Sequence, residues 1–281
     1  MADASIVIPA RNEGPLLTAT LTSLARTPAG ATFDVVVVDD GSAPPVAPLP
    51  VAGLQLRYLR GAGFGAAGAR NRGAAAATAD VLCFCDAHVA FAPGWLRALL
   101  ETLEQWDAVS PAIANAEQPR LAGYGFTWTP SFQAAWLPRP PNVRDVPFLP
   151  GACLTVRRTA FDAVRGFDDG LQPWGHEDVE ISLALWTCGY SCAVRPDVAV
   201  AHHFRQRHPY LVLREEVDRN LLRVGCVHLS RPRLQRLAGV LSADQRDVAA
   251  VSAAAAGRRM ALTPSRRRDD EWLCERFALP V

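Results

Sequence analysis

Short apolar runs alternate with helix-spaced apolar positions through the first two thirds of the chain. The runs Ser5–Ile8, Phe33–Val38 and Val81–Cys85 have the length and residue types of buried strands. Between them, leucines spaced as in Leu16–Leu24 are typical of an amphipathic helix. This alternation predicts an α/β fold, with a mostly parallel central sheet flanked by helices and ligand sites at its carboxyl edge. Further strands are expected at Leu54–Leu59, Ala108–Ile113, Phe148–Val156 and Val198–Val200, and further helices at Ala66–Ala77, Trp95–Leu103, Thr159–Val164 and Glu177–Cys188.

The periodic pattern stops at residues 115–147, which are rich in proline and aromatic side chains. A long irregular stretch inside a compact domain is more often functional than idle. We expect at least half of its rings to pack the stretch onto the body, while the others could flank a cleft that holds a sugar or an acceptor. The rings are Tyr124, Phe126, Trp128, Phe132 and Trp136.

The tail of the chain has a pattern of its own. Helices are expected at Leu211–Val227 and Leu234–Leu241, and residues 249–262 are rich in alanine. We therefore divide the chain into a main domain, residues 1–230, and a helical, partly flexible extension, residues 231–281. We see no chemistry in the extension.

Composition narrows the class of protein. A hydrophobic fraction of 49%, 20% charged residues and a net charge of +1 describe a globular chain without bulk attraction to nucleic acid or anionic membranes. None of the 29 basic residues is a lysine, which excludes Schiff-base chemistry and a lysine phosphate loop. No apolar run is long enough to span a bilayer, and the chain opens without a basic leader region, so we expect a cytoplasmic protein.

The seven cysteines include no Cys-x-x-Cys pair. Cys83 and Cys85 alternate along an expected strand, and Cys188 lies in an expected helix. Buried free thiols in a reducing compartment are favoured over disulfides or zinc.

Asp86-Ala87-His88 follows the expected strand Val81–Cys85 directly. A carboxylate and an imidazole two residues apart in an extended segment project to the same side. This pair suits a divalent cation such as Mn²⁺ whose remaining ligands are phosphate oxygens. An N-cap aspartate beside a surface histidine is the alternative. His202 is a second candidate ligand, because it also follows a strand.

Other polar residues cluster where expected strands end. Asp39 and Asp40 are placed as a nucleoside-binding carboxylate would be, although Asp-Gly-Ser is also a good turn. The glycine-rich turn Gly61–Gly65 opens a helix in which Arg70 would face a nucleotide. Behind Trp174-Gly175-His176, the acids Glu177, Asp178 and Glu180 exceed what a helix cap needs. Arg205, His208 and Tyr210 are typical of an anion-binding loop.

Taken together, these segments resemble a known family. In order and spacing they are similar to nucleotide-sugar glycosyltransferases of the metal-dependent A-type (GT-A) fold, family 2, and within that class to the polypeptide N-acetylgalactosaminyltransferases. The resemblance covers about Ser5–Tyr210. It rests on Ala10–Glu13, Val38–Ser42, Ala69–Ala74, Phe84–His88, Tyr124–Trp128, Trp174–Ser182 and His202–Tyr210.

The resemblance implies a GT-A catalytic domain over residues 1–230 and a role for each matching residue. Mn²⁺ or Mg²⁺ would be held by Asp86, His88 and His202 against the diphosphate of a UDP-sugar. Either Asp39 or Asp40 would meet the uridine, and Arg205, His208 and Tyr210 would belong to a mobile loop over the pyrophosphate. Trp174 and Glu177 would line the sugar and acceptor side. Donor binding would also involve Pro9, Ala10, Arg11, Glu13, Arg70 and Ala87, and catalysis Glu177, Asp178 and Arg205.

Three features depart from the animal enzymes. The animal enzymes have Asn where this chain has Asp178, and Gly where this chain has His176. Pro150–Ala152 also differs from the turn that the animal enzymes place beside the sugar. Glu177-Asp178 is instead the pair of a large inverting bacterial family, in which the Asp deprotonates the acceptor. Retention and inversion thus both stay open, as do the donor, for which UDP-GalNAc and UDP-GlcNAc are candidates, and a peptide, glycan or small-molecule acceptor. We expect neither a carbohydrate-binding β-trefoil nor a membrane anchor.

Two other functions compete with sugar transfer. A nucleotidyltransferase or sugar-nucleotide hydrolase on a similar sheet would need a cation in the first loop, where Arg11 lies, or acids for a second metal. A non-catalytic module that binds nucleotide sugars would be expected to lack some metal ligands, yet all three candidates are present. The pattern gives no oligomeric state.

Overall fold

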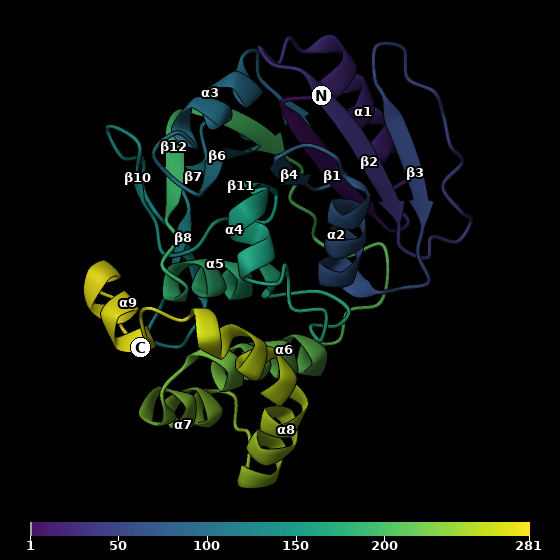
Figure 1. Ribbon diagram of the computed structural model, residues 1–281. Helices are drawn as coiled ribbons and strands as arrows, with labels where there is room; N and C mark the ends of the chain where they lie inside the picture. The colour runs from purple at the N-terminus through teal and green to yellow at the C-terminus, as the bar shows by residue number, and fades with distance from the viewer. Residues whose placement is uncertain (1) are drawn as a thin grey trace.

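The computed structural model describes residues 2–281 and is built on one ten-stranded sheet (Figure 1). Met1, where the predicted main domain and its amino-terminal segment begin, lies outside the described residues. The strand order is β10-β12-β6-β11-β4-β1-β2-β3, with β5 on β12 and β7 on β6, and β8 and β9 form a separate hairpin. The strands are β1 (Ala4–Ala10), β2 (Phe33–Asp39), β3 (Leu56–Arg60), β4 (Val81–Cys85), β5 (Val89–Phe91), β6 (Ala108–Asn115), β7 (Ala122–Gly123), β8 (Phe126–Trp128), β9 (Ala134–Trp136), β10 (Arg144–Asp145), β11 (Cys153–Arg157) and β12 (Cys192–His202).

Helices cover both faces of the sheet, as the alternating pattern predicts. Leu17, Leu21 and Trp95 from α1 and α3 join one apolar cluster, and Phe161 and Leu185 from α4 and α5 join another on the opposite face. The helices are α1 (Pro15–Arg26), α2 (Gly65–Ala76), α3 (Trp95–Thr102), α4 (Arg158–Ala163), α5 (Glu177–Thr187), α6 (Arg214–His228), α7 (Arg231–Val240), α8 (Gln245–Leu262) and α9 (Asp270–Phe277), with a 3₁₀ turn, η1 (Thr263–Ser265).

Strand direction decides where the site forms. β2 and β4 run parallel to β1, and β12 runs parallel to β6. β11 is antiparallel to both β4 and β6, so β4 and β6 point the same way. The carboxyl ends of β1, β2, β4, β6 and β12 therefore meet at one edge, together with the start of β11. The prediction of a mostly parallel sheet is confirmed, and the ligand sites expected at that edge stay a prediction.

Two of the predicted strands begin several residues from where they were expected, and the short strands β5, β7, β8, β9 and β10 were not predicted. β12 spans Cys192–His202 rather than Val198–Val200, because the polar stretch Arg195-Pro196-Asp197 hides its first half. The pairing with β6 shifts register between Arg195 and Ala199, and such an irregularity accommodates a proline, which has no N–H for the ladder. β11 begins at Cys153 rather than at Phe148, because Pro150–Ala152 forms a turn.

The carboxyl-terminal helices α6, α7 and α8 lie together at one end of the molecule, below α5 (Figure 1). A buried ion network joins α6 and α8 to α5. The carboxylate of Glu180 lies 2.9 Å from His228 Nε2 and 2.8 Å from Arg258 Nη2. Burial would raise the pKa of Glu180, but Arg258 and His228 outweigh it and hold the pKa well below its usual range. The extension thus fixes the helix whose first turn carries Glu177 and Asp178.

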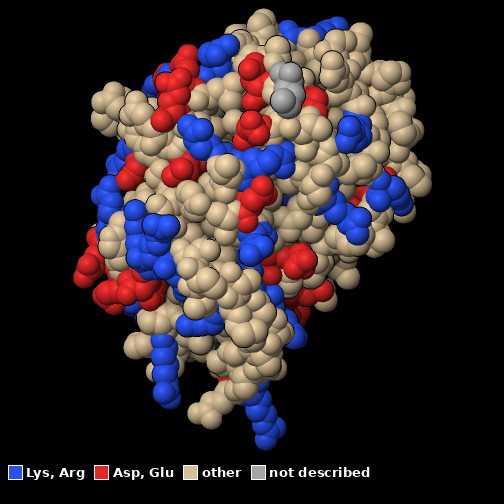
Figure 2. All heavy atoms as spheres, viewed as in Figure 1, with Lys and Arg blue, Asp and Glu red and all other residues tan. Residues whose placement is uncertain are grey.

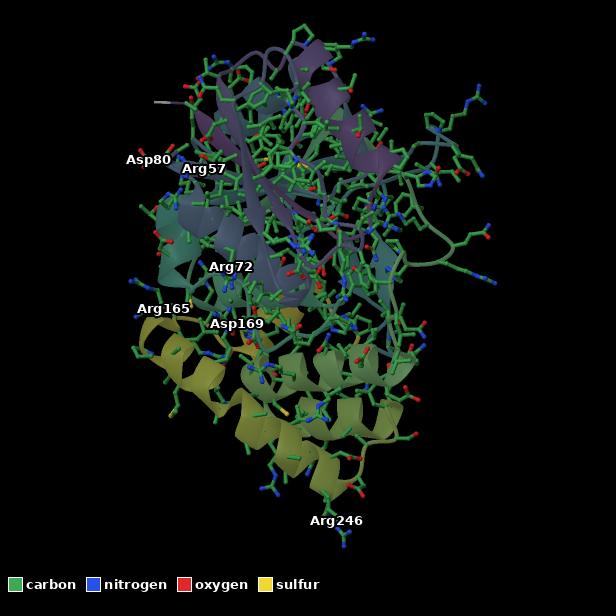
Figure 3. All side chains as sticks on the ribbon, turned by 90° about the vertical axis from the view of Figure 1, so that its right-hand side faces the viewer. Arg57, Arg72, Asp80, Arg165, Asp169 and Arg246 are labelled. Carbon is green, nitrogen blue, oxygen red and sulfur yellow. The ribbon has the colours of Figure 1, made fainter. Side chains whose placement is uncertain are left out.

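Acidic and basic side chains are interspersed over the face shown in Figure 2, in agreement with the small net charge. Turned by 90°, the molecule shows α8 reaching away from the sheet, with Arg246 near its far tip (Figure 3). Within residues 2–281, no helix combines the length and the apolarity that a membrane span requires. All seven cysteines are buried and none is in a disulfide, which confirms the predicted burial.

Candidate active site

A cleft of about 510 Å³ opens at the carboxyl edge of the sheet. It is lined by every residue to which the sequence analysis gives a role in donor binding, metal binding or catalysis, except Asp39, whereas Glu180 of α5 lies outside it. These residues come from the ends of β1, β2, β4 and β12 and the loops that follow them, from α2, and from the start of α5. The residues brought together are Pro9, Ala10, Arg11, Glu13, Asp40, Arg70, Asp86, Ala87, His88, Trp174, Glu177, Asp178, His202, Arg205, His208 and Tyr210.

Asp86, His88 and His202 form the polar centre of this cleft. One donor atom from each lies within 4.8 Å of the other two, and Asp86 Oδ2 is 3.3 Å from His202 Nε2 and 3.9 Å from His88 Nε2. β5 pairs with β12 so that Val89 faces His202, which brings the residue before Val89 to the end of β12. His203 N donates to His88 O at 3.0 Å and extends this pairing. Strand pairing, not sequence proximity, joins the third ligand to the first two.

Arg70 of α2 fixes the Asp86 carboxylate. Its side chain is 3% exposed, and the guanidinium donates to Asp86 Oδ1 and to Glu177 Oε1, each at 2.9 Å. Because Oδ1 is engaged, Oδ2 is the oxygen that faces the two imidazoles. Burial would raise the pKa of Asp86, but His202, Arg70 and His88 outweigh it, so the carboxylate stays ionised.

Glu13 orients His88 from the other side. Its Oε2 lies 3.4 Å from His88 Nδ1, and Arg205 forms an ion pair with the same carboxylate. Arg205 Nη2 also lies 3.0 Å from His88 Nδ1. A guanidinium can only donate, so Nδ1 accepts from Arg205 in one tautomer and donates to Glu13 in the other. The tautomer with its proton on Nδ1 leaves Nε2 free to bind a cation, as in carboxylate–histidine–metal arrangements. Burial would raise the pKa of Glu13, but His88 and Arg205 outweigh it and lower the pKa.

The donor set fits a divalent cation. One carboxylate and two imidazoles suit Mn²⁺, and they fill only one side of its coordination shell, so phosphate oxygens can complete it. The buried Nδ1 of His202 has no hydrogen-bond partner among residues 2–281, whereas Nε2 lies 3.3 Å from Asp86 Oδ2 and is the nitrogen on the side of the candidate ion. Asp86, His88 and His202 are therefore the residues that could hold the ion.

The start of α5 presents two acids to the cleft. Gly175 has φ +106°, a conformation that L side chains rarely adopt, and it lets the chain turn sharply into the helix. Glu177 Oε2 accepts the Gly175 N–H at 2.9 Å, while Asp178 accepts the N–H groups of Gly151 at 3.2 Å and Val179 at 2.8 Å. Burial, and then the charge of Glu177, raise the pKa of Asp178 to about 7 against the opposing effect of its hydrogen bonds. A carboxylate tuned to this range is suited to act as a base near neutral pH.

The two aspartates after β2 have different positions. Asp40 lines the cleft and accepts the N–H groups of Phe64 and Gly65 at 2.7 and 2.9 Å, so it also supports the start of α2. Asp39 forms an ion pair with Arg60 and accepts the N–H groups of Ser42 and Val46. Of the two candidates for a nucleoside contact, only Asp40 faces the cleft.

The segment after β12 folds back over the cleft. Tyr210 stacks under the guanidinium of Arg11, whose Cζ lies 4.9 Å from the ring centroid. The rings of His208 and Trp174 are 4.4 Å apart. Together with the Arg205–Glu13 pair, these contacts bring the predicted anion-binding loop against the first-strand loop and the α5 turn.

Sequence reasoning missed or left open part of the cleft wall. Of the aromatic side chains in residues 115–147, Phe126 and Trp136 line the cleft, whereas Trp128 and Phe132 are buried in the core. As predicted for this stretch, some of its rings pack into the core and others line the cleft. Phe204 and Val217 were not singled out, although both line the cleft, because a lone apolar residue in a loop or helix gives no signal of its own.

The chain matches known proteins over most of its length. The profile described as "Glycosyl transferase family 2" matches residues 5–165. A putative polypeptide N-acetylgalactosaminyltransferase 13 from Drosophila melanogaster is 31% identical over 242 residues, 74% of this chain and 43% of the relative. Human polypeptide N-acetylgalactosaminyltransferase 16 is 31% identical over 229 residues, 73% of this chain and 41% of the relative. The chain spans 20% to 43% of the length of these and similar curated relatives.

Solved structures share the fold. A crystal structure of GalNAc-T7 with UDP, GalNAc and Mn²⁺ superposes with a TM-score of 0.80 at 22% identity, covering 99% of this chain and 57% of that one. A mannosyltransferase from Pyrobaculum calidifontis in complex with GDP-Man and Mn²⁺ superposes with a TM-score of 0.55 at 17% identity, covering 94% and 74% of the two chains. The predicted GT-A fold is thereby confirmed. On the profile match, the chain belongs to glycosyl transferase family 2.

Proposed function

We propose that this protein is a metal-dependent glycosyltransferase that moves a sugar from a UDP-sugar to an acceptor hydroxyl. The observation that carries the proposal is the position of three metal-ligand candidates and a raised-pKa carboxylate in one cleft: Asp86, His88 and His202 line it together with Asp178. The names of the relatives make UDP-GalNAc the first donor to test. UDP-GlcNAc, the other candidate from the sequence, is the second.

Negative charge on the leaving diphosphate is the main barrier to such a transfer. A divalent ion, when bound, would neutralise part of that charge, usually the largest contribution in this kind of catalysis. Arg205 and Arg11 are the cations of the chain that line the cleft near the candidate ligands. Arg70 is 3% exposed and paired with two carboxylates, those of Asp86 and Glu177, so we assign it to positioning rather than to phosphate binding. Arg205 is 16% exposed and forms its ion pair with Glu13, so it is the more accessible cation.

We assign the base to Asp178. Near pH 7 about half of these carboxyl groups would be ionised, and the ionised form can accept the proton of an acceptor hydroxyl. The Gly151 and Val179 N–H groups hold its two oxygens and orient the carboxylate. A protein base of this kind leads to inversion, because the acceptor attacks from the face opposite the leaving diphosphate.

The test is an assay of purified protein with Mn²⁺ or with EDTA against UDP-, GDP- and dTDP-sugars, with released nucleotide as the readout. We expect metal-dependent release from a UDP-N-acetylhexosamine, increased by hydroxyl acceptors. Proton NMR of the product then gives the anomer. Folded protein that neither binds UDP in a metal-dependent way nor releases it would contradict the proposal, and a product with the donor's anomeric configuration would contradict the role of Asp178.

A further inference from the structure

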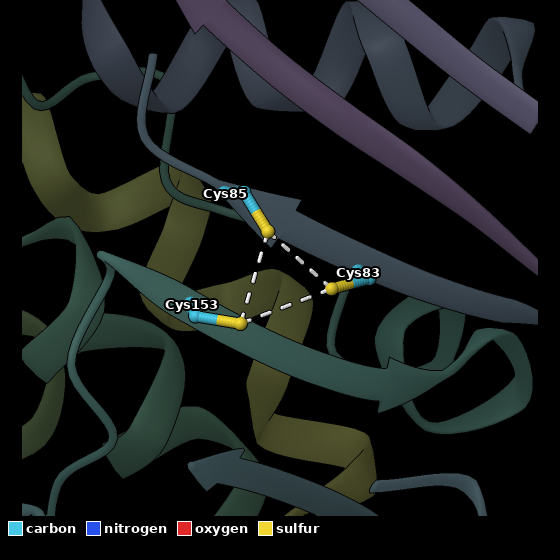
Figure 4. Close-up of side chains that lie close together, drawn as sticks. All are labelled: Cys83, Cys85 and Cys153. Atoms are coloured by element: carbon cyan, nitrogen blue, oxygen red, sulfur yellow. Dashed lines mark hydrogen bonds between the residues drawn. The ribbon is translucent and has the colours of Figure 1, made fainter. Parts of the chain in front are cut away.

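Three thiol groups meet inside the sheet, behind the candidate active site. Cys83 and Cys85 lie two residues apart on β4 and so face the same side of the sheet. Cys153, at the start of the neighbouring β11, is directly opposite Cys85 in the antiparallel register. All three side chains are 0% exposed, and Figure 4 shows their sulfurs turned toward one another.

The sulfurs form a nearly equilateral triangle. The Sγ–Sγ distances are 3.5 Å between Cys83 and Cys85, 3.7 Å between Cys85 and Cys153, and 4.0 Å between Cys83 and Cys153. A triangle with these sides has a circumradius of about 2.2 Å, close to the roughly 2.3 Å of a zinc–thiolate bond. An ion at the centre could bind all three sulfurs with little movement of the strands.

The surroundings offer the sulfurs almost nothing else. They lie in an apolar cluster with Ile6, Ile8 and Val109, and the only other polar contact recorded for them among residues 2–281 is the Thr155 hydroxyl, which donates to Cys83 Sγ at 3.2 Å. A disulfide is not formed, because its sulfurs would be about 2.05 Å apart.

The number and type of donors select the ion. Thiolates prefer soft metals, namely Cu⁺, zinc and iron–sulfur clusters. Structural zinc almost always takes four ligands, and iron–sulfur clusters are held by four cysteines. This group contains three donors, Cys83, Cys85 and Cys153. A single soft ion in a trigonal site is what the geometry fits.

We propose that Cys83, Cys85 and Cys153 form a trigonal thiolate site for one Cu⁺ ion, separate from the site for a divalent cation at the end of β4. Copper–sulfur bonds form as S–H bonds break, and the displaced thiol protons leave to solvent, with no change in oxidation state. Because the three side chains are fully buried, the ion is acquired as the chain folds.

Occupancy would tie together two strands that support the cleft. Cys85 precedes Asp86, and Cys153 follows Gly151 and Ala152, of which Gly151 donates to Asp178. Backbone pairing already holds the end of β4 against the turn that leads into β11, with Asp86 N donating to Ala152 O at 3.1 Å, so the ion would add to an existing contact.

The proposal is tested on the full chain produced in medium with and without added copper under reducing conditions. After removal of loosely bound metal with EDTA and a Cu⁺ chelator, mass spectrometry of the metals is expected to find one copper per chain. X-ray absorption at the copper edge is expected to show about three sulfur neighbours at 2.2–2.3 Å. The proposal would be overturned by protein that retains no copper or that retains zinc instead of copper. A Cys85–Cys153 disulfide, detected by a mass loss of about 2 Da, would also overturn it.

Two matched variants separate this site from general thiol binding. Cys153→Ser removes one donor with little change in size and is expected to lower copper retention by at least tenfold. Cys192→Ser alters an equally buried cysteine of β12 that is not one of the three proposed ligands, and this variant is expected to retain as much copper as the wild type. Equal retention in both variants would overturn the assignment. Should Cys153→Ser fail to fold, as judged by circular dichroism, Cys83→Ser takes its place.

Discussion

Strand β4 carries two clusters of opposite chemistry, one residue apart. At its end, Asp86 joins two histidines that are partly exposed, and charged neighbours on several elements surround them. Inside the strand, Cys83 and Cys85 meet a third thiol among apolar side chains, at 0% exposure. The first cluster offers oxygen and nitrogen to a hard or borderline ion, and the second offers only sulfur. Whether a side chain of β4 lies at the edge of the sheet or in its interior thus decides which chemistry it can perform.

The largest expected effect comes from Asp86→Ala. This variant removes the carboxylate that faces both imidazoles, and it leaves the buried Arg70 with Glu177 alone. Turnover with Mn²⁺ is expected to fall by about a thousandfold, while copper retention stays unchanged. The control is Asp80→Ala, because Asp80 is exposed and lies just before the same strand (Figure 3). This variant is expected to keep both its turnover and its copper. Loss of copper together with activity would show that the two clusters are not independent.

Asp178→Asn tests the catalytic side of the polar cluster. The base must be ionised, so wild-type turnover is expected to rise with pH through about 7, the pKa to which burial and Glu177 raise Asp178. The variant is expected to lose about 10²- to 10⁴-fold in turnover and this pH dependence, with UDP affinity retained. Steady-state rates between pH 5.5 and 9 provide the measurement. An unchanged pH profile in the variant would rule out Asp178 as the base.

Glu13→Gln tests how the polar cluster is oriented. The amide no longer fixes His88 through a charged oxygen and weakens the pairing with Arg205, so the affinity for Mn²⁺ is expected to fall by about 10- to 100-fold. Titration of Mn²⁺ followed by electron paramagnetic resonance of the free ion measures this. Glu117→Gln, an exposed carboxylate near His203, is the matched control. Equal affinities in the two variants would contradict the orienting role.

The smallest effect is the one that Cys153→Ser is expected to have on metal binding and turnover at the polar cluster. The Asp86 carboxylate bonds to Arg70 and His202 and to none of the sulfurs, so Mn²⁺ affinity and turnover should change by less than about twofold. The same titration and rate measurements apply. A tenfold change would mean that the thiol cluster controls the geometry of the active site.

The sequence by itself determined much of this arrangement. Val81–Cys85 is apolar enough to form a buried strand, and Asp86-Ala87-His88 is polar enough to end that strand. The strand and its pair of candidate ligands therefore follow from the local pattern. The same holds for β1, β2 and the helix that starts at Glu177. Free, buried cysteines also follow from composition, because an odd number without Cys-x-x-Cys spacing favours thiols.

Only the tertiary structure decided which of these residues meet. The pairing of β5 with β12 brings His202 to His88, and an antiparallel β11 places Cys153 opposite Cys85, although 68 residues separate the two cysteines. Asp39 and Asp40 have the same local pattern, yet one turns to Arg60 and the other to the cleft. A sequence pattern fixes the period and the burial of a segment, whereas register and strand order fix its neighbours. Those neighbours set charge, pKa and ligand geometry, and through them the chemistry of the site.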